Sequence, residues 1–210
     1  MAKQSLSLMP IAISMLAAIG YPTTNAAATA EVSPLQPTAS AMTVAQNPTP
    51  SDTNEKLPDV PAKLQVPAGN ALISQVSAKG VQIYACQPKT GDRTQFEWTL
   101  KAPEADLFNA SGALVGKHYG GPTWEYTKDK SKVVGEVKER VDSPDRTTIP
   151  WLLLSAKSNE GNGFFSKVTY IQRVNTKGGK APATGCDSSK QNSTTRVDYT
   201  ADYYFFAANK

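Results

Sequence analysis

The sequence predicts an all-β protein, an antiparallel β-sandwich or a barrel-like single domain. Three observations support this prediction: apolar residues recur at every second position, turn residues separate the apolar segments at short intervals, and no segment carries a convincing helical stripe of useful length. Successive side chains of a strand point to opposite faces, so a period of two predicts a strand with one buried face. Sandwich and barrel both satisfy this pattern and remain alternatives.

Residues 1–26 are typical of a secretory signal peptide. Lys3 supplies a positive charge, and Leu6–Ile19 form a mostly apolar stretch. Thr24–Ala26 provide a cleavage site of small residues, and Ala28–Ala30 provide an alternative one. The apolar stretch is shorter than the roughly 20 residues that a membrane-spanning helix needs. We therefore expect a secreted or periplasmic, soluble protein without a membrane span.

Residues 27–66 are predicted to be a disordered linker. Proline recurs there among Ala, Ser, Thr, Gln and Asn without hydrophobic periodicity. Few large apolar side chains are present to offset the entropy that ordering would cost. We therefore place one folded domain at 67–210, a length that suffices for a single hydrophobic core.

The predicted strands follow in order along this domain. They are Leu72–Val76, Val81–Ala85, Phe96–Leu100, Thr123–Tyr126, Lys132–Val141, Trp151–Ala156, Phe164–Val174 and Val197–Phe206. Trp151–Leu154 is apolar on both faces, which indicates a central strand. The last strand alternates cleanly until Tyr204 and Phe206 make its end apolar on both faces as well. Pro103–Phe108 is expected to form a single helical turn.

Cys86 and Cys186 are predicted to form a disulfide. They are the only cysteines, and an exported chain meets an oxidising environment. In the chain-entropy description, closing a loop of about 100 residues stabilises a fold by roughly 4–5 kcal/mol. A reactive thiol is the alternative, but neither cysteine lies in a CxxC motif.

Four separated motifs resemble an uncharacterised secreted family, domain of unknown function 3455. They are Gly80–Cys86, His118–Glu125, Ile149–Leu154 and Val168–Gly179. The resemblance extends over essentially all of 67–210 and implies no established activity. Some fungal relatives bear a malate dehydrogenase label. We do not adopt it here, because the chain lacks the Gly-rich strand-to-helix turn and the alternating βα units of a dinucleotide site.

The candidate ligand site is the segment that holds His118, Tyr119, Trp124 and Glu125. It combines the only imidazole with two aromatic rings, a carboxylate and a Gly-Gly-Pro turn that lets a ligand approach the backbone. Tyr119 and Trp124 would supply stacking surface for a glycan or a small apolar ligand. The competing interpretation is that these side chains belong to the core or to turn packing.

Composition excludes several other functions. One histidine and two cysteines are too few for a multi-histidine metal centre, a four-cysteine zinc site or an iron–sulfur cluster, and we expect no metal and no cofactor. A net charge of +4 is too small to indicate a nucleic-acid partner. We expect a ligand-binding or envelope-associated module. A hydrolase that uses His118 with a carboxylate, and a purely structural or stress protein, remain alternatives.

Overall fold

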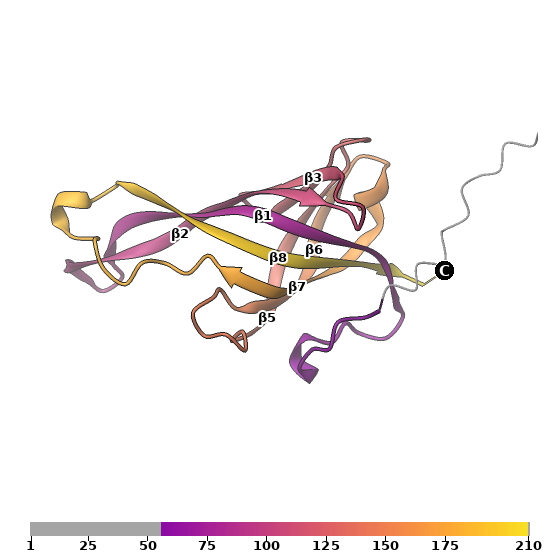
Figure 1. Ribbon diagram of the computed structural model, residues 1–210, viewed down its shortest axis with the longest axis horizontal. Helices are drawn as coiled ribbons and strands as arrows, with labels where there is room; N and C mark the ends of the chain where they lie inside the picture. Colours follow the sequence, from indigo (N-terminus) through magenta and orange to yellow (C-terminus); the bar gives the residue numbers. More distant parts are fainter. Residues whose placement is uncertain (1–55, 210) are drawn as a thin grey trace, which may run out of the picture. The chain divides into compact units, whose positions relative to one another are not determined.

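The computed structural model describes residues 56–209, and in this range eight antiparallel strands form one sheet that closes into a barrel. Each strand pairs with the next along the chain, and β8 returns to pair with β1 (Figure 1). The strands are β1 (Asn70–Lys89), β2 (Asp92–Phe108), β3 (Leu114–Tyr119), β4 (Thr123–Tyr126), β5 (Lys132–Val141), β6 (Trp151–Glu160), β7 (Val168–Gly178) and β8 (Thr194–Ala208). The all-β prediction is confirmed. Of the two predicted alternatives, the sheet forms a barrel rather than a sandwich, because β8 pairs with β1 and closes it. The predicted signal peptide, 1–26, and most of the predicted linker lie outside the described residues.

The first two predicted strands are one long strand, β1. Gly80, which interrupts the apolar pattern between them, lies where β1 comes close to β2. A Cβ atom at Gly80 would lie 2.1 Å from the carbonyl oxygen of Glu104, so only glycine allows this approach. The residue that looks like a break in the sequence therefore keeps the strand continuous against its neighbour.

The helical turn predicted for Pro103–Phe108 is wrong, because β2 continues through Phe108. Ala105 and Leu107 alternate into the interior there and pair with β1, which outweighs the local preference of a short segment. Pro103 is tolerated because β2 pairs with β3 only from Ala105 onward, so the proline lies where the strand has a single partner.

An unpredicted strand and the start of β7 also differ from the prediction. β3 was not predicted, because a strand of this length that contains Gly116 shows too little alternation. Phe164–Lys167 form a short 3-10 helix, η2, so β7 begins at Val168. Phe165 of η2 is buried and packs against the ring of Phe205, at 4.7 Å between ring centroids.

Hydrophobic residues gather on both sides of the sheet. The inner cluster fills much of the barrel and includes Trp124, Phe165, Ile171, Tyr203 and Phe205. The outer cluster consists of Val174, Tyr204 and Phe206, against which Val60, Val66, Leu72, Trp151 and Tyr170 pack. This arrangement explains why the start of β6 and the end of β8 are apolar on both faces.

The end of the predicted linker packs on this outer cluster. Residues 62–64 form the 3-10 helix η1, and Leu64 is fully buried. The side chain of Gln172 on β7 donates from Nε2 to the carbonyl oxygen of Leu64 at 2.6 Å. The packed part of the chain therefore begins before residue 67.

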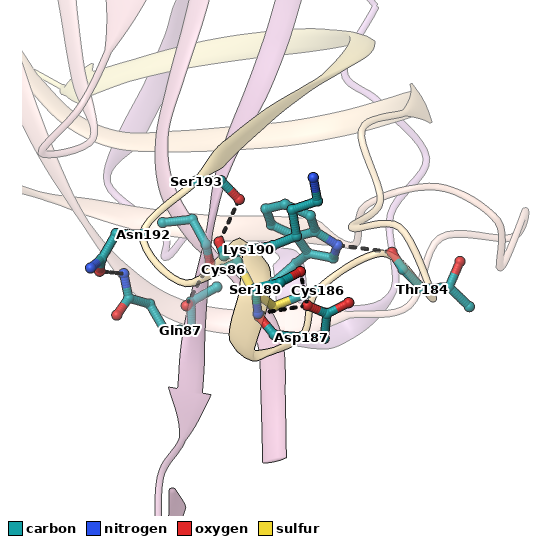
Figure 2. Close-up of a disulfide and its surroundings, with 12 residues drawn as sticks. Cys86, Gln87, Thr184, Cys186, Asp187, Ser189, Lys190, Asn192 and Ser193 are labelled. Carbon is teal, nitrogen blue, oxygen red and sulfur yellow. Dashed lines mark hydrogen bonds between the residues drawn. A yellow bond between two sulfur atoms is a disulfide. The ribbon is translucent and has the colours of Figure 1, made fainter. Parts of the chain in front are cut away.

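β1, β2 and β8 continue past the rest of the sheet toward the left of Figure 1, where the β1–β2 turn and the 3-10 helix η3 (Ser188–Lys190) lie. The predicted disulfide between Cys86 and Cys186 is present at this end, with 5.4 Å between the two Cα atoms (Figure 2). Around it, the indole Nε1 of Trp98 donates to the carbonyl oxygen of Thr184 at 3.0 Å. The disulfide therefore attaches the loop before β8 to the extended part of β1.

Candidate functional site

The β3–β4 hairpin divides the four predicted site residues between two faces of the barrel wall. His118 pairs with Trp124 across the hairpin, and the two side chains are only 3% and 1% exposed. Because neighbouring residues of a strand point to opposite faces, Tyr119 and Glu125 lie on the outside. The structure therefore brings His118 together with Trp124 inside the barrel, and Tyr119 together with Glu125 outside it.

His118 is packed as a neutral ring. It stacks on Trp124, with 4.3 Å between centroids and 15° between planes, and Tyr203 meets it edge-on. Nδ1 lies 2.8 Å from the carbonyl oxygen of Thr123, which can only accept, so Nδ1 carries the proton and donates. Burial lowers the pKa of His118 to about 3, and the positive charge of Arg173 acts in the same direction.

Tyr119 and Glu125 form a separate pair on the outer face. The Tyr119 hydroxyl donates to Oε2 of Glu125 at 3.0 Å, and Nζ of Lys130 lies 3.8 Å from Oε1 of the same carboxylate. Desolvation and the carboxylate together raise the pKa of Tyr119 to about 12. Glu125 therefore interacts with Tyr119 and Lys130, and the barrel wall separates it from the ring of His118.

A cavity of about 230 Å³ lies inside the barrel next to His118 and Trp124. Its apolar wall includes Leu152 and Leu154, and its rim includes Leu100 and Val137, which are 55% and 44% exposed. The rim residues come from β2 and β5, on either side of the point where the short β3–β4 hairpin ends. The remaining lining residues are Gln82, Lys101, Ala102, Pro103, His118, Gly121, Pro122, Trp124, Arg140, Arg173 and Tyr203.

Space for the Trp124 ring comes from the absence of a side chain on β5. A Cβ atom at Gly135 would lie 2.9 Å from Cζ3 of Trp124 and 3.0 Å from Cδ2 of Leu154. The indole can therefore approach the backbone of β5 closely. Gly135 thus helps to keep the Trp124 ring in its position beside the cavity.

Two residues that line this cavity carry buried polar atoms without partners. Gln82 Nε2 and Trp124 Nε1 have almost no accessible surface and make no hydrogen bond within the described part of the chain. The Tyr203 hydroxyl interacts electrostatically with Tyr199 and Arg173 but has no hydrogen bond of good geometry there. A buried polar group without a partner costs about 1–3 kcal/mol, so a side-chain rotation that brought these atoms to the cavity surface would let a ligand pair with them favourably.

Among the cavity residues that sequence reasoning missed are Gln82, Arg173 and Tyr203. Arg173 and Tyr203 lie opposite each other on β7 and β8, whereas Gln82 comes from β1, far from both in the sequence. No clear signal was available, because β7 mixes polar and apolar residues and Arg173 does not stand out in it. Gln82 and Tyr203 lie in ordinary alternating strands.

Comparison with known proteins identifies the family. The family described as "Protein of unknown function (DUF3455)" matches residues 67–207, which covers the whole barrel except the end of β8. The chain belongs to the DUF3455 family. No curated protein and no solved structure matches it. Membership in DUF3455 therefore brings no substrate or activity with it, and the function has to be argued from the site.

Residues 56–209 show neither a membrane-spanning helix nor a cluster of metal ligands. No helix in this range has the length and apolar character needed to cross a membrane. No group of three or more His, Cys, Asp or Glu side chains in this range is placed to hold a metal ion.

Proposed function

We propose that this DUF3455 protein is an exported binding protein that holds one small, partly apolar molecule inside its barrel. The observation that carries the proposal is the cavity of about 230 Å³, whose leucine and aromatic walls include Gln82 and Trp124, two residues with unpaired polar atoms buried beside it. Binding sites combine apolar walls with a few placed polar groups in this way. Eight-stranded barrels have an interior wide enough for one small ligand.

The size of the cavity limits the ligand. A cavity of about 150 Å³ is large enough for benzene, so this one accommodates a ring with one or two substituents. The exposed rim residues Leu100 and Val137 would contact the ligand as it enters. These features support a small apolar ligand over a glycan, because a glycan would need an open aromatic platform.

Export is part of the proposal. The predicted signal peptide supports it, and the Cys86–Cys186 disulfide is the kind of bond that persists outside the cytoplasm. The protein would then encounter its ligand in the periplasm or in the medium outside the cell.

The hydrolase alternative receives no support from the site. A general base needs a pKa near the working pH and a partner that orients it. The pKa of His118 is about 3, its Nδ1 is bonded to a backbone carbonyl, and Glu125 lies on the other face of the wall. No Asp or Glu is among the residues that line the cavity.

The test uses small neutral aromatic probes. Benzyl alcohol and benzamide are titrated into the disulfide-bonded domain, and the indole Nε1–H signal of Trp124 is followed by NMR. We expect saturable shifts at Trp124. Leu152→Phe should weaken binding at least tenfold, because the larger ring occupies the cavity, while Leu114→Phe serves as the matched control on an exposed position of β3. An unmoved Trp124 signal with every probe would refute the proposal.

A further inference from the structure

The charges around the cavity all have one sign. Arg173 lies inside the barrel and is 9% exposed, while Lys101 and Arg140 line the same cavity from exposed positions on β2 and β5. The lining contains no acidic residue. None of the three cations forms an ion pair with a carboxylate within residues 56–209.

Arg173 is only partly satisfied by the protein. Its Nε and Nη2 atoms donate to the carbonyl oxygen of Pro150 at 3.3 and 2.8 Å, and the guanidinium also interacts with the Tyr203 hydroxyl. A backbone carbonyl and a neutral hydroxyl supply hydrogen bonds but no negative charge. A buried charge without a counter-ion is costly, so a bound anion would stabilise Arg173.

The unpaired neutral atoms favour the same kind of ligand. Gln82 Nε2 and Trp124 Nε1 can only donate hydrogen bonds. A ligand that satisfies them must bring acceptor atoms, and a carboxylate offers two oxygens with several acceptor positions. Its pairing with an arginine is among the stronger polar interactions in proteins.

We propose that the ligand is a small organic carboxylate with an apolar, ring-sized body, bound with its carboxylate at Arg173 and Gln82 and its body against Trp124 and Leu154. This inference rests on the proposed function, because it names the chemical class of the molecule in the same cavity. Lys101 and Arg140 lie at the rim and attract the anion as it approaches. Attraction by exposed charges of this kind depends on ionic strength.

The experiment compares benzoate with its neutral isostere benzamide. Both are titrated into the disulfide-bonded domain, with the Trp124 indole signal as the NMR readout and calorimetry for affinity. We expect benzoate to bind at least tenfold more tightly than benzamide, because hydrogen bonds to charged groups contribute roughly twice as much as neutral ones. Arg173→Gln should bring the two affinities together, and Arg173→Lys should retain part of the preference.

Variants at the rim keep the test independent of the barrel interior. Arg140 is exposed, so Arg140→Gln should leave the fold intact and weaken benzoate binding by about two- to fivefold without affecting benzamide. Arg93→Gln, at an exposed position away from the cavity, is the matched control and should change neither affinity.

The outcomes separate this inference from the proposed function. Equal affinities for benzoate and benzamide in the unaltered protein, or an undiminished preference for benzoate in Arg173→Gln, would overturn the carboxylate inference while ligand binding in the barrel stands. If neither compound shifts the Trp124 signal, the proposed function fails together with the inference.

Discussion

Neutral burial of His118 predicts a specific loss of stability in mild acid. The folded protein holds the pKa of this ring at about 3, against 6.5 for an unperturbed histidine. Between these two values only the unfolded chain binds the proton, so the free energy of unfolding falls as the pH falls. The contribution is fully present above pH 6.5 and decreases as the pH is lowered toward 3.

The magnitude follows from the two pKa values. Lowering the pH from 7 to 5 should reduce the free energy of unfolding by about 2 kcal/mol through this one site. Each pH unit between the two pKa values changes that free energy by about 1.4 kcal/mol. For a marginally stable domain this is a large fraction of the total free energy of unfolding.

The assay is urea unfolding of the ligand-free domain at pH 7 and at pH 5, compared between the unaltered protein and His118→Asn. The asparagine amide can still donate to the Thr123 carbonyl but does not titrate. The variant loses the stacking on Trp124 and will be less stable at both pH values, so the readout is the difference between them. Carboxylates contribute equally to both proteins and cancel.

We expect the pH-dependent loss to be smaller by about 2 kcal/mol in His118→Asn than in the unaltered protein. If both proteins lose the same free energy between pH 7 and pH 5, His118 titrates normally in the folded state. The assignment of a buried, neutral ring that donates through Nδ1 would then be wrong.

Four further predictions concern other parts of the chain. Replacing both Cys86 and Cys186 by serine should lower the free energy of unfolding by about 4 kcal/mol, since a loop of about 100 residues is released, and a change below about 1 kcal/mol in urea unfolding would contradict this. Trp124→Ala should lower the free energy of unfolding by about 3–5 kcal/mol, because it removes a buried ring that packs on His118, Tyr203 and Phe205. Urea unfolding measures this loss, and a near-neutral effect would place Trp124 outside the core. Limited proteolysis with mass spectrometry should leave a resistant fragment that still contains Leu64, and a stable fragment starting at residue 67 would count against the packing of η1. Intact mass of protein from the native host should show a mature chain that begins near Ala27 or Glu31, and full-length protein retained in the cytoplasm would contradict export.

Part of the candidate site followed from the sequence and part did not. The segment from His118 to Glu125 was singled out because it collects the only imidazole and two aromatic rings. Its division between two faces depends on the register of the hairpin, in which His118 lies opposite Trp124. A turn one residue longer or shorter would have changed which residues share a face. Sequence spacing alone does not determine that register.

The sequence by itself determined the all-β class, the disulfide and most strand positions, because these depend on alternation within a few residues and on a cysteine count that allows one intramolecular pair. Only the tertiary structure decided that the sheet closes, that β3 and β4 end early, and that Gln82, Arg173 and Tyr203 meet beside Trp124. The physical reason is that a cavity is formed by strands distant in the sequence, and its charge is the sum of side chains that each lie in an ordinary strand. Local periodicity describes which face a residue occupies, whereas the pairing of β8 with β1 decides which residues face one another across the interior.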